Sequence, residues 1–483
     1  MSQVPENIWA IGGWDTSGGA GLTRDAIVAS QLSAHCTPLP TLISLQTHDQ
    51  SYGFESIDTD LFKQQLLCAI KQPPAAIKVG AVADDAHIQT LIELKQRHFP
   101  EVPLVWDPVM QTSCGGSFGR LTDTTIAALL QHCTLVTPNL DELYRLADTR
   151  CYSTAVKYWQ TMGARALLVK SDSACEQSIT DTLYTCDITW RYTGERFDVP
   201  NVRGTGCTLA TSLAVALARN YAIEDAMCLA RAWIHNVIAN AHTLTSHQAL
   251  AGPAVCHPAP EYFAQVQRNN PLTVPACRFA ALHKPKIGLY PVIDDVGWLP
   301  LLIEAGITTV QLRIKHDCDI ALRRQIHQAV KLCYASNIQL FINDHWQLAI
   351  EAGAFGVHLG QDDLNQANLE AIATAGLRLG VSTHGYAELC RVLPLRPSYI
   401  ALGHVFATKT KAMPSSPQGT QRLSEYRALC QNIPTVAIGG INLTRLPSVQ
   451  AAGITNVAVV SAITQAENPA QVISGFQKAL YND

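Results

Sequence analysis

Residues 339–363 read QLFINDHWQLAIEAGAFGVHLGQDD, and the fold of the second half of the chain depends on the pattern in this stretch. Two short apolar runs, 339–342 and 356–359, lie on either side of a segment with apolar residues at helical spacing. Polar residues follow each run directly. A strand, a helix and a second strand in this order predict one unit of a parallel sheet, with polar side chains at the carboxyl ends of the strands.

The same unit recurs on both sides of this stretch. We predict eight strands, each followed by a helical pattern, at residues 287–293, 309–314, 339–342, 356–359, 378–381, 399–401, 435–438 and 456–459. Eight strand–helix units within roughly 200 residues predict a (β/α)8 barrel, the TIM-barrel fold. In such a barrel the ligand-binding residues lie just after the strands.

Charged and amide side chains follow the second, third and fourth of these strands. Gln311, Arg313 and Lys315 alternate and therefore share one face of their strand. Facing inward they suit an anionic, phosphate-like ligand, whereas facing outward they form a cationic surface. Asp344 and Asp363 suit a Mg²⁺ ion that also touches phosphate oxygens, and the alternative for Asp363 is to cap the next helix. Beside a predicted phosphate site, we favour the metal.

Three further segments at this end of the predicted barrel suit phosphate binding. Gly439-Gly440 follows the seventh strand, and Ser461 opens the helix after the eighth. Backbone N–H groups from a glycine pair and a helix N-terminus form the usual phosphate cradle of such barrels, although the glycines alone are also typical of a turn. Thr408–Lys411, rich in hydroxyl and amine groups, follows the sixth strand.

The first half of the chain also alternates strands with helices. We predict strands at residues 8–12, 41–45, 76–79, 104–106, 134–136 and 166–169, with helical patterns between most of them. This order predicts an α/β domain with a mainly parallel sheet and helices on both faces. The polar, β-rich residues 181–199 predict edge strands or a flap.

An irregular stretch with three prolines, residues 269–285, separates the two halves. It has no clear period, and proline ends both helices and strands. We therefore predict a first domain of residues 1–268, a linker of residues 269–284 and a second domain of residues 285–483.

Two glycine-rich segments of the first half predict ligand contacts. Asp15 lies within residues 12–21, GGWDTSGGAG, where it binds a substrate group or closes a turn. Gly204, Gly206 and Cys207 belong to Gly-Thr-Gly-Cys directly before a helix, which predicts an anion hole for a transferring phosphoryl group. At this helix N-terminus we expect a lowered thiol pKa and a role as base for Cys207, and the alternative is a buried cysteine behind a turn.

Polar groups end other strands of the first half, on the edge of the sheet where ligands bind. Asp107 ends one predicted strand. Asn139 and Glu142 follow another, where Glu142 holds Mg²⁺ through water or, alternatively, forms a capping box with Asn139.

The composition excludes several classes of function. The 35 Lys and Arg residues against 39 Asp and Glu residues give a net charge of −4, which provides no general attraction to nucleic acid or anionic lipid. No window predicts a transmembrane helix, and the first ten residues predict no signal peptide. The 15 cysteines form no CxxC pair, which predicts reduced thiols in a cytoplasmic protein rather than disulfides or a zinc site.

Residues 285–483 closely resemble thiamine phosphate synthase, through YPVID, VQLRIK, FINDH, GVHLGQDD, TKTK, AIGGI and VAVVSAI in that order. The resemblance implies condensation of hydroxymethylpyrimidine diphosphate with hydroxyethylthiazole phosphate, releasing pyrophosphate. It implies Mg²⁺ on Asp344 and Asp363. It further implies three sets of contacts: Gln311, Arg313, Lys315 and Asn343 with the diphosphate; Ser382, Thr408, Thr410 and Lys411 with pyrophosphate or pyrimidine; and Gly440, Val460 and Ser461 with the thiazole phosphate.

Residues 5–265 resemble the hydroxymethylpyrimidine/phosphomethylpyrimidine kinase branch of the ribokinase-like fold, a three-layer α/β/α architecture. The residues that carry the resemblance are IGGWDTSGGAG, SLQT, DPVM, TPNLDE and GTGC. The resemblance implies two successive ATP-dependent phosphorylations. It places Gln46 and Asp15 on the pyrimidine, Cys207 on the hydroxymethyl group, and Asp107, Asn139, Glu142 and Lys170 on the ATP and Mg²⁺ side.

Together the two resemblances imply a bifunctional enzyme of thiamine biosynthesis whose first domain makes the substrate of the second. Its expected partners are hydroxymethylpyrimidine, ATP and hydroxyethylthiazole phosphate, with Mg²⁺ as cofactor and no nucleic acid or membrane; a homo-oligomer is left open. Trp14, Thr16, Ala81, Arg203 and the segment 171–173 depart from the kinase pattern. The alternative is therefore a monofunctional synthase with a degenerate, ligand-binding kinase-like domain.

Overall fold

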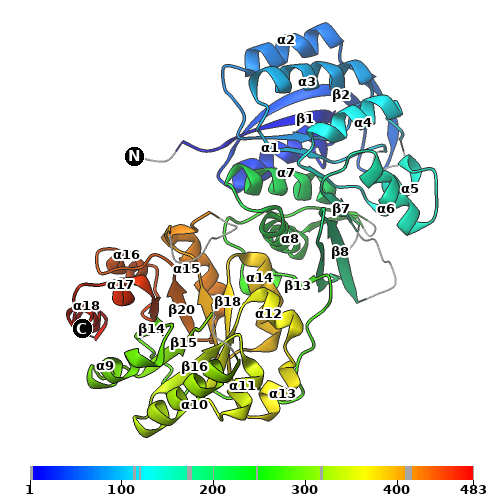
Figure 1. Ribbon diagram of the computed structural model, residues 1–483. Helices are drawn as coiled ribbons and strands as arrows, with labels where there is room; N and C mark the ends of the chain where they lie inside the picture. Colours follow the sequence, from blue (N-terminus) through cyan, green and yellow to red (C-terminus); the bar gives the residue numbers. More distant parts are fainter. Residues whose placement is uncertain are drawn as a thin grey trace. The chain divides into compact units, whose positions relative to one another are not determined.

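The computed structural model describes residues 4–111, 116–118, 121–170, 177–199, 201–245, 248–315, 319–407 and 416–481. The chain forms two compact units, Met1–Asn269 and Asn270–Asp483. Figure 1 shows them with the first in blue to green and the second in green to red. No helix among the described residues is both long enough and apolar enough to cross a bilayer.

A ten-stranded sheet forms the centre of the first unit. In spatial order its strands are β13 (Gln265–Arg268), β9 (Thr189–Glu195), β8 (Ser178–Tyr184), β7 (Leu167–Val169), β6 (Leu135–Val136), β5 (Leu104–Trp106), β4 (Ala76–Val79), β1 (Asn7–Asp15), β2 (His35–Gln46) and β3 (Ser51–Ser56). The strands from β7 to β2 pair in parallel, and the outer strands pair antiparallel. Successive strands add to opposite sides of β1, so the chain reverses its direction of growth between β1 and β4, where such sheets bind ligands.

Helices cover both faces of this sheet, which confirms the predicted three-layer domain. One face packs against α2 (Thr59–Ala69), α3 (Asp85–His98), α4 (Asp123–His132), α5 (Leu140–Leu146) and α6 (Tyr152–Thr161). The other packs against α1 (Gly21–Gln31), α7 (Thr205–Ala218) and α8 (Ile223–Ala239). Helix α7 is buried over ten consecutive residues because it lies between the sheet and its helical neighbours, which explains its apolar sequence on all sides.

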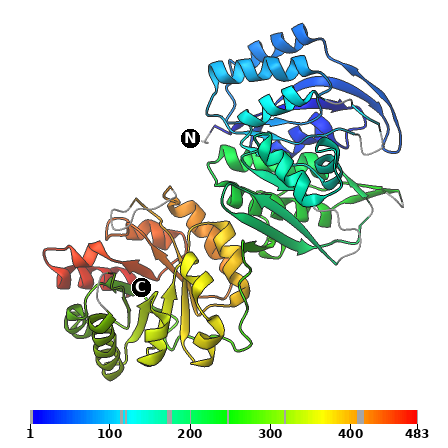
Figure 2. The same cartoon turned by 45° about the vertical axis from the view of Figure 1, so that its right-hand side comes forward.

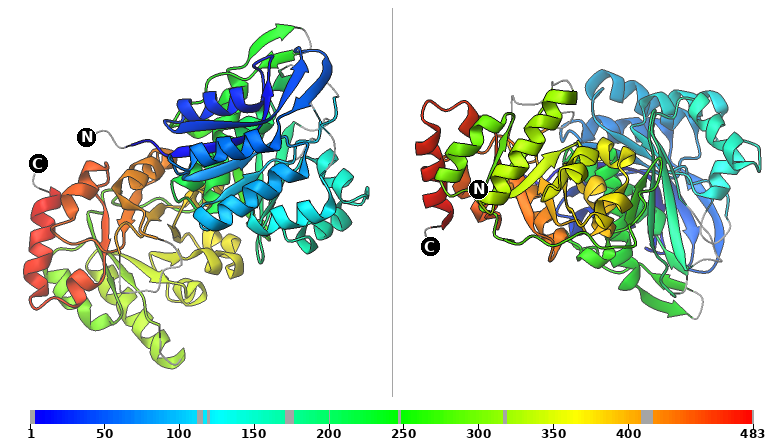
Figure 3. Two further views of the ribbon diagram at one scale, coloured as in Figure 1. Left: turned by 90° about the horizontal axis from the view of Figure 1, so that it is seen from above. Right: turned by 60° about the horizontal axis from the view of Figure 1, so that its bottom comes forward.

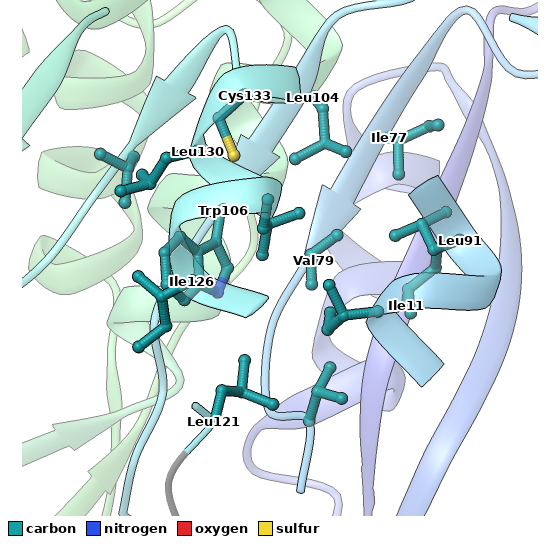
Figure 4. Packing of buried hydrophobic residues seen from close by; sticks show 14 of the residues in the cluster. Ile11, Ile77, Val79, Leu91, Leu104, Trp106, Leu121, Ile126, Leu130 and Cys133 are labelled. Atoms are coloured by element: carbon teal, nitrogen blue, oxygen red, sulfur yellow. The ribbon is translucent and has the colours of Figure 1, made fainter. Parts of the chain in front are cut away.

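The larger core of the first unit lies between the sheet and α2–α6. Trp106 and Val79 of the sheet meet Ile126 of α4 and Leu91 of α3, and Cys133 packs among them as a small apolar residue (Figure 4). A second sheet has three strands in the order β10 (Asn201–Arg203), β12 (Gln248–Leu250) and β11 (His242–Thr245). Strand β10 directly precedes α7 and ends at Arg203, which lines the cavity described below.

The second unit is a closed barrel of eight parallel strands, as predicted. They are β14 (Leu289–Ile293), β15 (Thr309–Leu312), β16 (Gln339–Asn343), β17 (Gly356–Leu359), β18 (Arg378–Thr383), β19 (Tyr399–Leu402), β20 (Thr435–Ile438) and β21 (Val457–Val459). Helices surround the strands (Figures 2 and 3). They are α9 (Leu299–Glu304), α10 (Asp319–Ala335), α11 (Trp346–Glu351), α12 (Gln361–Gln366), α13 (Leu369–Thr374), α14 (Tyr386–Val392), α15 (Gly419–Cys430), α16 (Leu446–Ala451), α17 (Ser461–Thr464) and α18 (Pro469–Tyr481).

Part of the segment predicted as a linker belongs to the barrel instead. Leu282 is buried in the barrel core with Tyr290 and Phe341. Ser398 donates a hydrogen bond from its hydroxyl to the carbonyl of Ala280 (2.7 Å), so residues 276–284 form a strap across the amino-terminal ends of the strands. The apolar side chains of this strap find a core to enter, which proline content alone did not predict.

Candidate functional sites

A cavity of about 330 Å³ lies at the carboxyl ends of β1, β4, β5, β6 and β7, at the point where the sheet reverses direction. The structure brings together in its lining every residue expected to act in the first domain. These are Asp15, Gln46, Asp107, Asn139, Glu142, Lys170, Gly204, Gly206 and Cys207.

The predicted anion hole is the N-terminus of α7. Gly204 precedes the helix with φ +80°, and a side chain there would collide with the carbonyl oxygen of Gly19, so only glycine fits. The hydroxyl of Thr208 donates to the carbonyl of Gly204 (2.7 Å), and the guanidinium of Arg24 donates to that hydroxyl (2.9 Å). The backbone of this turn is therefore fixed before any ligand arrives.

The expected lowering of the Cys207 pKa is wrong. The thiol is partly exposed to the cavity, yet burial raises its pKa to about 11, and the carboxylates of Asp25 and Asp107 raise it further. The ammonium of Lys78 acts in the opposite direction but does not prevail. Burial among two carboxylates thus outweighs the helix N-terminus, and Cys207 is a thiol at neutral pH.

Asp15 closes a turn, as the alternative interpretation had it. Its carboxylate accepts hydrogen bonds from the backbone N–H of Ser17 (2.8 Å) and of Ala20 (2.9 Å). It also forms a buried ion pair with Arg203 (3.3 Å). Gln46 differs, because its side-chain oxygen is buried without a hydrogen-bond partner among the described residues, and a ligand edge would satisfy it.

Lys170 joins the two carboxylates on the opposite side of the cavity. Its ammonium lies 2.8 Å from Asp107 and 4.0 Å from Glu142. Glu142 forms the capping box with Asn139, both hydrogen bonds being 2.8 Å. Burial raises the pKa of Glu142 to about 7 although Lys170 opposes the shift. A nearby cation stabilises the ionised form of a buried carboxyl such as Glu142.

The second group of predicted residues lies at the carboxyl ends of the barrel strands. Asp344 follows β16 with φ +62°, and its backbone N–H donates to the carbonyl of His358 on β17 (3.0 Å). Asp363 lies in the first turn of α12 and accepts a hydrogen bond from the N–H of Gly360 (3.2 Å), so its capping role is real. Burial, together with the charge and hydrogen bond of Asp363, raises the pKa of Asp344 to about 6.

A polar chain that the sequence did not predict runs through the interior of the barrel. The hydroxyl groups of Tyr290 and Tyr399 lie 2.8 Å apart, and Tyr399 is 2.7 Å from Nδ1 of His358. Nε2 of His358 lies 2.8 Å from the hydroxyl of Ser382. Gln311 donates from its amide to Tyr290 at the other end (3.5 Å), which places it inside the barrel. Burial and the charge of Arg313 lower the pKa of His358 to about 3, so this ring is neutral.

The remaining predicted residues of the barrel occupy its rim. Asn343 is buried at the end of β16, and Lys315 is exposed. Gly440 has φ +65°, and a Cβ there would lie 2.6 Å from the carbonyl oxygen of Ala407. Val460 and Ser461 begin the short helix α17. Thr408, Thr410 and Lys411 lie outside the described residues.

Comparisons with known proteins give each unit a family. The family profile described as thiamine monophosphate synthase matches residues 289–463, and that described as phosphomethylpyrimidine kinase matches residues 15–252. The thiamine-phosphate synthase of Enterobacter sp. (strain 638) is 55% identical over 181 residues, which are 38% of this chain and 86% of that protein. That of Photorhabdus laumondii is 54% identical over 183 residues, 38% of this chain and 85% of that protein.

Solved structures resemble each unit separately. A phosphomethylpyrimidine kinase from Clostridium difficile 630 has a TM-score of 0.42 and 24% identity, covering 48% of this chain and 99% of its own. A thiamine phosphate pyrophosphorylase from Pyrococcus furiosus has a TM-score of 0.37 and 25% identity, covering 41% of this chain and 96% of its own. On the family profiles and the sequence identity, the chain belongs to the thiamine-phosphate synthase family, and a phosphomethylpyrimidine kinase domain precedes its synthase domain.

Proposed function

We propose that the two domains catalyse consecutive reactions in the cytoplasm, with the first unit, residues 1–269, as the kinase and the second unit, which includes the strap of residues 276–284, as the synthase. The kinase converts 4-amino-5-hydroxymethyl-2-methylpyrimidine to its mono- and diphosphate with ATP. The synthase joins the diphosphate to hydroxyethylthiazole phosphate, forming thiamine phosphate and pyrophosphate. The single observation that carries this proposal is the convergence, in one cavity, of every residue expected from the kinase sequence.

In the kinase, Gln46 presents its unpartnered oxygen to the pyrimidine edge. The N–H groups at the start of α7 hold the phosphoryl oxygens, and Lys170 lies on the side of the cavity where the nucleotide phosphates would bind. Only the thiolate form of Cys207, a small fraction at neutral pH because burial raises the thiol pKa to about 11, accepts the proton of the hydroxymethyl group. The hydroxymethyl oxygen bonds to phosphorus as the bond from phosphorus to ADP breaks, and the base contributes about 10²–10⁴-fold to the rate.

Mg²⁺ fits the synthase residues on one observation. Two carboxyl groups, Asp344 and Asp363, are held close enough to share a hydrogen bond and to raise the pKa of Asp344 to about 6, and a divalent cation between them would remove this repulsion. When bound there, Mg²⁺ would supply positive charge to the diphosphate leaving group. The described residues include no group of three or more metal-ligating side chains, so Asp344 and Asp363 would hold the ion together with substrate oxygens and water.

Side chains and backbone groups of the synthase domain bind and orient its substrates. Gln311, Arg313, Lys315 and Asn343 bind the diphosphate, so that charge on the leaving oxygen is stabilised as the carbon–oxygen bond breaks. Ser382, oriented by the neutral ring of His358, faces the pyrimidine or the pyrophosphate. Gly440, Val460 and Ser461 cradle the thiazole phosphate, and Thr408, Thr410 and Lys411 contact the pyrophosphate or the pyrimidine.

Separate assays of the two steps test this proposal. The full chain, given hydroxymethylpyrimidine, ATP and Mg²⁺, should release two equivalents of ADP per pyrimidine. Given the synthetic diphosphate and hydroxyethylthiazole phosphate, it should release one equivalent of pyrophosphate without ATP. Synthase activity without ADP release would instead establish the monofunctional alternative.

A further inference from the structure

A buried ion pair lies under the kinase cavity and has no part in the mechanism above. Lys78 on β4 and Asp25 on α1 are 1% and 0% exposed, and the ammonium lies 2.8 Å from Oδ2 of the carboxylate. The hydroxyl of Thr211 on α7 donates to the other carboxylate oxygen (2.7 Å). Both members of the pair line the cavity. The carboxylate of Asp25 is therefore fixed by two donors, and its ion pair fixes the position of the Lys78 ammonium.

The pair lies next to Cys207. Thr211 and Cys207 are four residues apart on α7 and so share one face of that helix. Gly80 leaves space for the side chain of Lys78 at the end of the strand, because a Cβ at residue 80 would lie 2.8 Å from the Lys78 ammonium. Lys78 thus places its charge at the base of the cavity, on the side where Cys207 lies.

Stability does not explain such a pair. Removing two charges from water is unfavourable, and well-packed apolar side chains in the same place are often about as stabilising or more so. A pair retained inside a cavity wall is better explained by what it does for that cavity. We propose that Lys78, held in place by Asp25, is a positioning residue of the kinase whose ammonium stabilises negative charge on Cys207 during phosphoryl transfer. This inference rests on the proposed role of Cys207 as base.

Charged groups from three other segments also act on Cys207, and none has as large an effect on its pKa as Lys78. They are Arg24 and Asp25 from α1, Asp107 after β5 and Lys170 after β7. Lys170 is engaged by Asp107, and Arg24 by backbone carbonyls and Thr208. Burial has the largest effect on the Cys207 pKa; among the charged groups Lys78 has the largest effect and lowers the pKa, whereas Asp25 and Asp107 raise it.

Alkylation of Cys207 by iodoacetamide, followed against pH by peptide mass spectrometry on the full chain, tests the proposal. The thiolate is the reactive form, so the midpoint of the rate profile reports the thiol pKa. Lys78→Met should move the midpoint up by about one pH unit or more, which slows alkylation about tenfold at pH 8. Asp25→Asn, which still bonds to Lys78 and Thr211, should move the midpoint down and speed alkylation.

Opposite signs separate an electrostatic role from a structural one, because loosening of the site would speed alkylation in both variants. Arg231→Met breaks another buried pair of the same unit, with Asp181 (3.0 Å), and should leave the Cys207 midpoint unchanged. If Lys78→Met does not fold, Asp25→Asn decides alone, and an unchanged or raised midpoint overturns the proposal. A Cys207→Ala kinase close to wild type would refute the base role, whereas the midpoint shifts would still establish the effect of Lys78 on the thiol.

Discussion

Single residues carry the strongest tests of the kinase site. Because burial raises the pKa of Cys207 to about 11, only a small fraction is thiolate at neutral pH. The value of kcat/KM for the first phosphorylation should therefore rise about tenfold per pH unit between about pH 7 and 10. A steady-state pH profile of ADP release measures this slope. A rate that is flat over the range would mean that proton removal does not limit the reaction.

Removal of the thiol gives the matching variant. Cys207→Ala should lower the first phosphorylation by about 10²–10⁴-fold, the usual contribution of a general base, and should abolish the pH slope. Synthase activity of the same protein, measured with added diphosphate, should be unchanged and serves as the control for folding. Kinase activity within a few-fold of wild type would leave Cys207 as a packing residue.

Asp344 makes a prediction that does not depend on turnover. A carboxyl whose pKa is about 6 when folded and lower when unfolded binds more protons in the folded state. The unfolding free energy should therefore fall as pH rises from about 4 to about 6, and stay low above that. In Mg²⁺-free buffer at pH 7.5, Asp344→Asn should melt a few degrees above wild type, since the repulsion with Asp363 is gone.

In the presence of Mg²⁺ the wild type should melt above Asp344→Asn. Adding it should raise the Tm of the wild type and leave that of Asp344→Asn nearly unchanged, while the variant loses synthase turnover by orders of magnitude. Differential scanning calorimetry with and without EDTA checks both effects. A wild-type melting curve indifferent to Mg²⁺ and to pH would show that the two carboxylates hold no metal.

The sequence identified the site residues that follow strands but not those that depend on distant partners. Gln46, Asp107 and Lys170 end strands, and the edge of a parallel sheet brings them together. Lys78 stands inside the apolar strand AIKV, and its partner Asp25 is 53 residues away on a helix, so only the folded chain shows the pair. The hydrogen bond between Tyr290 and Tyr399 could not be predicted either, because tyrosine is common in strands and gives no sign of a buried polar partner.

At the scale of the elements, the strap of residues 276–284 shortens the connection between the two units. Its backbone is tied by Gln339, which accepts from the N–H of Lys284 (3.0 Å), and by Ser398. Only residues 270–275 remain between Asn269, the last residue of the first unit, and the strap. Six residues extend to about 20 Å, well below the span of the whole predicted linker.

Leu282 should therefore matter to the stability of the barrel. Its side chain is 8% exposed and packs in the barrel core, so Leu282→Ala should cost about 2–5 kcal/mol of unfolding free energy. The matched control is Val274→Ala, because Val274 is 55% exposed and precedes the strap. Urea unfolding followed by synthase activity distinguishes them. Equal midpoints for both variants would show that the strap is dispensable.

Prediction of the elements succeeded where apolar periodicity is strong. All eight barrel strands and all six central strands of the first unit occur where expected, within a few residues. The short strands β3, β10, β11, β12 and β13 were not predicted. They lie at sheet edges or in the small sheet, where pairing with a neighbour rather than an apolar pattern stabilises the strand.

For the whole molecule, the two active sites should act independently on a shared intermediate. A mixture of full-length Cys207→Ala and Asp344→Ala contains one intact synthase site and one intact kinase site on different chains. The diphosphate is small and soluble, so the mixture should make thiamine phosphate from hydroxymethylpyrimidine although neither variant does so alone. Thin-layer or liquid chromatography of the products measures this. An inactive mixture of individually competent domains would show that the intermediate must stay on one chain.

A single reaction of the wild-type chain, followed by phosphorus NMR, tests most directly whether one chain catalyses both phosphorylations and the condensation. Hydroxymethylpyrimidine, ATP, Mg²⁺ and hydroxyethylthiazole phosphate are combined, and spectra are taken over time. Pyrimidine monophosphate and then diphosphate should appear transiently, and thiamine phosphate and pyrophosphate should accumulate with two ADP per product. Thiamine phosphate that forms only when the diphosphate is supplied, with ATP left unconsumed, would show that the chain is not a bifunctional enzyme.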